Sequence, residues 1–131
     1  MLKELGIKNF VLIEELRLEF DAGLNVLTGE TGAGKSIILD AVGLMLGDRF
    51  SAESVRQGAE RASLSAVLDA PKSREFRAWW EEKGWDASEE ILIRREGYAD
   101  GRSKAFLNDE PVTLSTLQEL GAFLIDVHGQ N

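Results

Sequence analysis

The sequence predicts an α/β fold with a mixed or antiparallel sheet, and three observations lead to it. Several short segments alternate apolar and polar residues, as strands with one buried face do. A glycine-rich loop at 29–36 lies between a short apolar run and a helix-like segment. Turn-forming residues later in the chain favour a β-hairpin. With 131 residues, of which 44% are hydrophobic and 29% charged, the chain is expected to form one globular unit or part of a larger one.

The N-terminal elements are predicted from short-range patterns. Residues 16–20 alternate between apolar and charged side chains, which indicates a strand, and 21–23 supply a turn. The apolar run 24–28 is expected to be a second strand that enters the glycine loop. Residues 37–46 have helical character and are followed by Gly47, a residue that commonly ends helices. The predicted order is strand, glycine loop, helix.

The middle of the chain is predicted to contain a strand and a helix. Alternation over 64–68 indicates the strand. Ser73 is suited to cap a helix that runs to Gly84. Trp79 and Trp80 lie on this helix, and we expect them to form a packing face rather than a ligand site.

A β-hairpin is predicted next. The strands are expected at 91–95 and 104–107, because the segment between them is rich in turn residues. Residues 108–111 form a second turn signal. The central part of the sheet is therefore expected to be antiparallel.

The C-terminal segment is predicted to hold a short helix and a strand. Ser115 and Gln118 have the spacing of a capping box, and the helix is expected to end at Gly121. The apolar run 123–127 is interpreted as a buried strand. A domain that ends directly after such a strand is unusual, so an incomplete domain is expected.

Charge and cysteine content narrow the classes of function. The chain has 15 basic and 23 acidic residues, a formal net charge of −8 and no cysteine. Disulfide frameworks, thiolate zinc sites and cysteine nucleophiles are excluded, and a reducing, cytoplasmic location is expected. The longest apolar stretch, 37–46, contains Asp40 and is too short to span a bilayer. Because an acidic chain repels polyanions, nucleic acid could be contacted only through a local basic patch or a partner segment.

The segment 29–36 matches the phosphate-loop (Walker A) pattern G-x-x-x-x-G-K-[ST]. Its glycines allow the backbone amides to surround phosphate oxygens at the positive end of the following helix. Lys35 is expected to neutralise the β- and γ-phosphates, and the Ser36 hydroxyl to bind Mg²⁺. The residues expected to contact the nucleotide are Gly29, Glu30, Thr31, Gly32, Ala33, Gly34, Lys35, Ser36 and Ile37.

Hydrolysis needs a second magnesium carboxylate and a group that polarises water. Asp126 and Asp69 follow apolar runs, but both are interpreted as ordinary acids at strand ends. Gln130 could reach Mg²⁺ or the attacking water, with an ordinary exposed glutamine as the alternative. His128, the single histidine, is expected to be structural.

Basic residues gather around the predicted hairpin. They are opposed there by Glu96 and Asp100, which leaves a local positive charge in an acidic chain. Such a patch is suited to DNA phosphates, and a solvated hairpin or an interface with another lobe is the alternative. The candidate DNA contacts are Arg94, Arg95, Arg102 and Lys104.

Residues across the whole chain resemble the N-terminal part of the ATPase head of the RecN family, SMC-like bacterial DNA repair proteins of the ABC ATPase class. The segment Leu5–Phe10 is similar to the first strand of such heads, and 23–27 to the strand that enters the loop. The specific part is 28–36 with its Glu-Thr pair at positions where condensin-type SMC loops carry Pro-Asn. Residues 126–130 are similar to the Q-loop of the family.

The resemblance implies an N-terminal lobe over 1–131, with the Walker A motif at 29–36 and the Q-loop at 128–131. It implies ATP and Mg²⁺ as ligands, with Lys35 and Gln130 taking part in hydrolysis and Ser36 and Gln130 binding the metal. The chain lacks the L-S-G-G signature motif, an apolar run that ends in Asp-Glu, and heptads. The C-terminal lobe and the coiled coil are therefore expected elsewhere.

The family further implies two heads that close on ATP, as a homodimer, and tether DNA at double-strand breaks. Location at the nucleoid, with no membrane, follows from that role. The chain alone is expected to bind ATP without efficient turnover. A small phosphate-loop kinase, in which Arg94, Arg95 and Arg102 would be lid arginines, is the alternative enzyme. A nucleotide-binding module without turnover is a third hypothesis.

Overall fold

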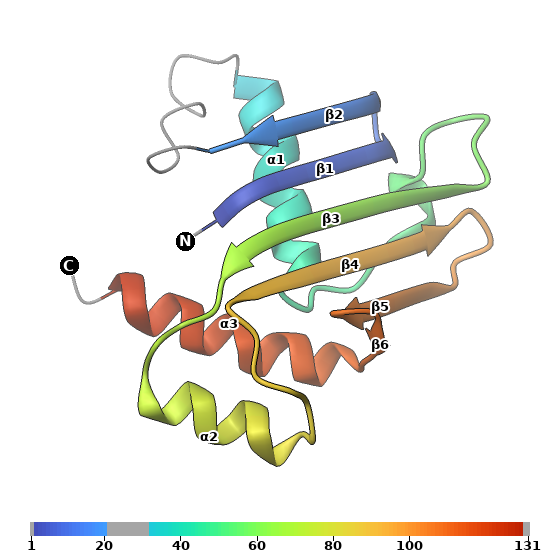
Figure 1. The fold of residues 1–131 in the computed structure, drawn as a ribbon. Helices are drawn as coiled ribbons and strands as arrows, with labels where there is room; N and C mark the ends of the chain where they lie inside the picture. Colours follow the sequence, from blue (N-terminus) through green and yellow to red (C-terminus); the bar gives the residue numbers. More distant parts are fainter. Residues whose placement is uncertain (1, 21–31, 130–131) are drawn as a thin grey trace.

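The computed structural model describes the backbone of residues 2–20 and 32–129 and the side chains of 2–20 and 36–124 (Figure 1). The turn and strand predicted at 21–23 and 24–28 lie outside the described residues. In chain order the elements are β1 (Leu2–Phe10), β2 (Ile13–Glu19), α1 (Gly32–Met45), the short 3₁₀ helix η2 (Ala52–Ser54), β3 (Arg61–Asp69), α2 (Arg74–Glu82), β4 (Glu90–Tyr98), β5 (Ser103–Leu107), β6 (Glu110–Pro111) and α3 (Leu114–Gly129).

The described strands form one sheet in the order β2-β1-β3-β4-β5-β6. Every neighbouring pair is antiparallel, so the sheet expected to be mixed or antiparallel is antiparallel over this part of the chain. The register places Leu5 opposite both Leu18 on β2 and Ala66 on β3. Alternate residues of all the long strands therefore share one face.

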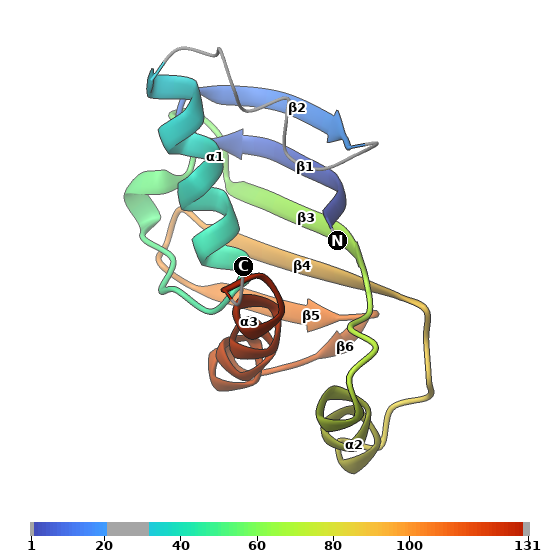
Figure 2. The same ribbon diagram turned by 90° about the vertical axis from the view of Figure 1, so that its left-hand side faces the viewer.

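The apolar face of the sheet is covered by α1 and α3, which lie on the same side (Figure 2). Among the described elements, none covers the opposite face of the sheet. The core lies between the sheet and the two helices. Its most buried members include Leu5, Ile7, Leu64, Ile91, Ile93, Leu107, Ala41, Met45, Leu117 and Leu120.

Helix α2 begins where the sequence predicts it. The Ser73 hydroxyl accepts a hydrogen bond from the Phe76 backbone N–H at 3.1 Å, as an N-cap does. The aromatic side chains of α2 pack on α3, with the ring centres of Trp79 and Phe123 5.3 Å apart. Trp80 is 4% exposed. The prediction that the two tryptophans form a packing face is confirmed.

The predicted hairpin is confirmed by the pairing of β4 with β5. The second turn, between β5 and β6, holds Asn108 and Asp109 at φ 47° and 69°. Positive φ at both central residues matches the twist of a two-residue hairpin. The Asn108 side-chain oxygen also accepts a hydrogen bond from the Leu92 N–H at 2.7 Å, which ties the turn to β4.

The C-terminal prediction is wrong in its second half. Residues 123–127, expected as a buried strand, belong to α3, which continues through Gly121. A run of apolar residues has no period that separates a strand from a buried helix. Gly121 does not end the helix; it is buried where an added Cβ would lie 3.4 Å from Leu46. The helix cap also lies two residues earlier than expected, because the Thr113 hydroxyl, not that of Ser115, accepts a hydrogen bond from the Thr116 N–H at 3.2 Å.

The segment after α1 is fitted closely to β4. Gly97 lies under the Phe50 ring, and a Cβ added at Gly97 would lie 2.2 Å from a ring carbon. Phe50 in turn packs edge-on against Phe10, with ring centres 6.2 Å apart. Glycine at this position of β4 therefore makes the space that the ring occupies.

We expect Gly97→Ala to lower the free energy of unfolding by about 1–3 kcal/mol, because a crowded core must shift to admit a methyl group. Denaturant unfolding of the chain measures the change. The matched control is the same substitution in a Phe50→Ala background, where the space is free and the added cost of Gly97→Ala should largely vanish. Equal costs in both backgrounds would contradict the role of the ring.

Candidate functional site

The phosphate-loop motif runs into the N-terminus of α1. Apolar residues at Ile38, Ala41 and Met45 recur at helical spacing and are buried against the sheet, which explains why this segment is helical. Gly47, at φ 109°, follows the end of the helix. The first turn contains no acidic residue. Its backbone N–H groups have no partner within the helix, so this end of α1 is suited to an anion.

Most of the predicted nucleotide contacts lie at or before this helix end. Residues 29–31 lie outside the described residues. Residues 32–35 form the first turn of α1, which begins five positions earlier than the helix predicted from Ile37. Ser36 is exposed and Ile37 is half-buried. The structure thus joins the second half of the motif to the helix, and the nucleotide contacts themselves remain predictions.

The segment predicted to lead into the Q-loop has a different secondary structure from the one that the sequence indicates. His128 and Gly129 are the last residues of α3, whereas Gln130 and Asn131 lie outside the described residues. The segment that leads to Gln130 is therefore a helix and not a strand. The role of Gln130 in binding magnesium or water stays a prediction.

The two carboxylates weighed as magnesium ligands gain no support. Asp69, at the end of β3, lies 3.9 Å from the Lys3 ammonium and is exposed. Asp126 is part of α3 by its backbone. Within the part of the chain that the structure describes, no group of three or more His, Cys, Asp or Glu residues could hold a metal ion.

Three of the four candidate DNA contacts lie on the uncovered face of the sheet or on the hairpin beside it. The Arg94 guanidinium stacks on the Phe106 ring, 4.3 Å from its centre. Arg102 and Lys104 both approach Tyr98, at 5.1 Å and 5.6 Å from the ring centre. Cations interleaved with aromatic rings are a pattern that nucleic-acid surfaces use.

Carboxylates oppose these cations more strongly than the sequence predicts. Arg94 lies 3.4 Å from Asp109, and Arg102 donates to Asp100 at 2.8 Å. The Arg102 backbone N–H is the main cause of a lowered pKa for Asp100, and the Arg102 side chain adds to it. Asp100 is therefore ionised at neutral pH and offsets the Arg102 charge.

The fourth candidate, Arg95, is wrong as a DNA contact because its side chain is fully buried. Successive residues of a strand face opposite sides, so Arg94 lies on the uncovered face and Arg95 in the core. Nη1 of Arg95 donates to the backbone oxygens of Leu44 and Asp48 at the end of α1, the latter at 2.9 Å. Burial lowers the pKa of Arg95, and the Asp48 carboxylate opposes that shift.

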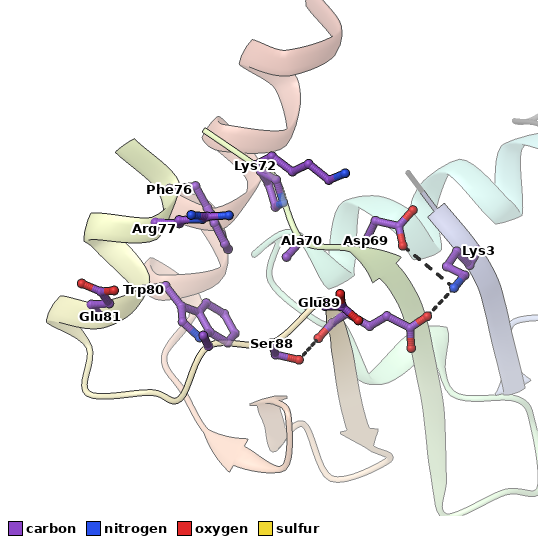
Figure 3. A pocket seen from close by; sticks show the side chains of 13 residues that line it. Lys3, Asp69, Ala70, Lys72, Phe76, Arg77, Trp80, Glu81, Ser88 and Glu89 are labelled. Atoms are coloured by element: carbon purple, nitrogen blue, oxygen red, sulfur yellow. Dashed lines mark hydrogen bonds and ion pairs between the residues drawn. The ribbon is translucent and has the colours of Figure 1, made fainter. Parts of the chain in front are cut away.

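An open pocket of about 900 Å³ lies at the other end of the sheet (Figure 3). It is lined by the start of β1, the end of β3, α2 and the segment before β4. Lys3 bonds to Glu90 there, and this hydrogen bond is the main cause of a raised pKa for Lys3. Sequence reasoning missed the pocket because its lining comes from segments far apart in the chain. None of the described residues that line it belongs to the phosphate-loop motif.

A protein-family model described as "AAA domain" matches residues 4–118. The chain belongs to the AAA domain family. The resemblance to RecN is also confirmed: the whole chain is 46% identical over 131 residues to the DNA repair protein RecN of Vibrio cholerae, and 46% identical over 132 residues to that of Bacillus subtilis. It is 37% identical to RecN of Rickettsia conorii. The chain spans only 23–24% of the length of these relatives.

Solved structures share the fold of this AAA domain. A chain from work on ATP-driven dimerization and DNA-stimulated activation of SMC ATPases superposes with a TM-score of 0.69 at 24% identity, covering 91% of this chain and 76% of the other. The recombination mediator protein RecF gives 0.68 at 20% identity, covering 89% and 29%. An SMC head domain from Thermotoga maritima gives 0.58 at 24% identity, covering 90% and 41%. The fold is the phosphate-loop ATPase fold of these SMC and RecF structures, of which this chain forms a part.

None of the helices that the structure describes combines the length and apolar character needed to cross a bilayer.

Charge reversal at the two adjacent arginines of β4 should change the stability of this AAA domain by very different amounts. Arg95→Glu places a carboxylate against backbone oxygens in the core and should lower the free energy of unfolding by about 3–5 kcal/mol. Arg94→Glu, on the uncovered face, should change it by no more than about 1 kcal/mol. Denaturant unfolding compares them, and similar losses for both variants would contradict the assignment of the two faces.

Proposed function

We propose that this AAA domain is the ATP-binding N-terminal part of an SMC-like DNA repair ATPase head. The observation that carries the proposal is the phosphate-loop motif ending in α1, in a chain that matches RecN along its whole length. The SMC-head and RecF fold is consistent with it. The alternative of a small kinase loses one of its proposed lid arginines, since Arg95 is buried under α1.

In this proposal the start of α1 and the loop before it hold the nucleotide phosphates. Backbone N–H groups bind the phosphate oxygens, and Lys35 neutralises the charge of the β- and γ-phosphates. Ser36 is exposed next to the first turn, and its hydroxyl suits Mg²⁺, an ion that prefers oxygen ligands. When bound, Mg²⁺ would supply positive charge that stabilises the negative charge developing on the phosphates. Gln130 contributes its side-chain oxygen to the metal and the attacking water.

The remaining catalytic groups are proposed to lie in the C-terminal lobe of the same protein and in a second head. ATP then joins two heads, and hydrolysis separates them. The SMC ATPase with the same fold comes from work on ATP-driven dimerization, which supports this scheme. The output is reversible tethering of DNA during recombinational repair of double-strand breaks, carried out at the nucleoid in the cytoplasm.

The chain alone should bind MgATP without sustained hydrolysis. Lys35→Ala should weaken binding at least about tenfold, because a charge-assisted contact contributes ~1.5–3 kcal/mol. Fluorescence titration and phosphate release measure the two properties, with Lys72→Ala as the matched control outside the motif. Unchanged affinity in Lys35→Ala would refute the phosphate site, and steady turnover by the monomer would favour the kinase alternative.

DNA contact through the uncovered face is proposed to depend on Lys104, which has no ion-pair partner among the described residues. In the complete protein, Lys104→Gln should weaken DNA binding and reduce the slope of log affinity against log salt by about 1. Lys72→Gln, at an exposed lysine before α2 that also has no ion-pair partner among the described residues, is the matched control. If affinity and slope are the same in both variants, the uncovered face does not contact DNA phosphates.

A further inference from the structure

The C-terminal end of α1 is held by a buried cation. Arg95 is the one charged residue that is buried among the described side chains, and it is 0% exposed. Its Nη1 donates to the oxygens of Leu44 and Asp48, and Nη2 lies 3.5 Å from the Ser103 hydroxyl. The last carbonyls of a helix carry the negative end of its dipole, so a cation at this place is favourable.

Two further contacts hold the same helix end. Nε2 of Gln118, on α3, donates to the Gly47 oxygen at 3.0 Å. Phe50 lies on Gly97 of β4, which has no side chain to displace it. The segment 44–50 is therefore fixed by β4 and by α3 together, whereas the other end of α1 belongs to the phosphate-loop motif.

We propose that Arg95 is a positioning residue of the nucleotide site, on which it acts through α1. The inference rests on the proposed ATP site at the opposite end of this helix. Helix α1 is continuous over 14 residues, from Gly32 to Met45. Such a helix moves as a unit, so a displacement where Arg95 holds it becomes a displacement of its first turn, which is the second half of the phosphate-loop motif.

The guanidinium group supplies what an apolar side chain of the same volume lacks. Its planar donors fix the Leu44 and Asp48 carbonyls relative to β4. A lysine binds as a point charge, and an apolar side chain fills the space without bonding to either carbonyl. Arg95 therefore adds to the contacts of Gln118 and Phe50 in fixing this end of α1 relative to β4.

A shift of α1 should affect hydrolysis more than binding. The N–H groups of the first turn of α1 bind phosphate locally, and this turn moves together with the helix. Hydrolysis also needs the loop aligned with groups on other elements, and misplacement by about 1 Å can cost up to 10²-fold in rate. Loss of Arg95 should therefore lower kcat and leave KM nearly unchanged.

The test compares Arg95→Lys, Arg95→Met and Gln118→Ala in the full-length protein, with Arg17→Met as the control. Arg17 is exposed on β2 and pairs with Glu4, away from α1. The kcat for ATP hydrolysis should fall about tenfold in Arg95→Met. It should fall less in Arg95→Lys and Gln118→Ala, with KM within about twofold, and stay unchanged in Arg17→Met. Gln118→Ala keeps the test informative if Arg95→Met does not fold.

Hydrogen exchange of the nucleotide-free protein supplies a second readout. Amides along all of α1 should exchange faster in Arg95→Lys, because the whole helix is released. Faster exchange confined to 44–48, or an unchanged kcat in the folded variants, or a raised KM at constant kcat, overturns the proposal. Lys35→Ala, measured alongside, separates the two ideas. If it leaves ATP binding intact, the proposed site fails; if it abolishes binding while the Arg95 variants keep full kcat, only the inference about Arg95 fails.

Discussion

The alternation of side chains along β4 decides which residues of this chain meet the helices and which meet solvent. Ile91, Ile93, Arg95 and Gly97 lie on the face that α1 and α3 cover. Arg94, Glu96 and Tyr98 lie on the other face. Because the six strands are in antiparallel register, the same alternation continues across the sheet and gives one apolar and one polar face. A shift by a single residue would exchange Arg94 and Arg95, and with them the basic surface and the support of α1.

Much of the fold could be predicted from local patterns. The strands around 64–68, 91–95 and 104–107 are predicted by alternating residues or by flanking turns. Ser73 predicts the start of α2, and Gly47 predicts the end of α1. These features act over a few residues, so the sequence displays them directly. The prediction for 123–127 was wrong because a short, mostly apolar segment has no period that separates a strand from a helix, and packing on the core decides between the two.

Part of the candidate site could likewise be predicted from the sequence, and part of it could not. The phosphate-loop motif and its helix are visible because function requires particular residues at fixed spacing. The burial of Arg95 was not visible, since an arginine in a strand gives no local sign that it faces the core. Its partners are backbone oxygens 47 and 51 positions away, and no residue type marks a backbone oxygen in a sequence. The pairing of Arg94 with Asp109, 15 positions away, was not visible either, because it depends on the turn between β5 and β6.

The two outer strands of the described sheet affect how other protein segments can contact this part of the chain. Along the edge formed by β2, Glu14, Glu15, Arg17 and Glu19 are exposed charges, and such charges discourage the approach of another strand. At the other edge, β6 has only two residues, and its Pro111 has no N–H to donate. Both edges of the described sheet therefore disfavour strand addition. Other protein segments are expected to contact this part of the chain through helices and side-chain surfaces rather than by lengthening its hydrogen-bonded sheet.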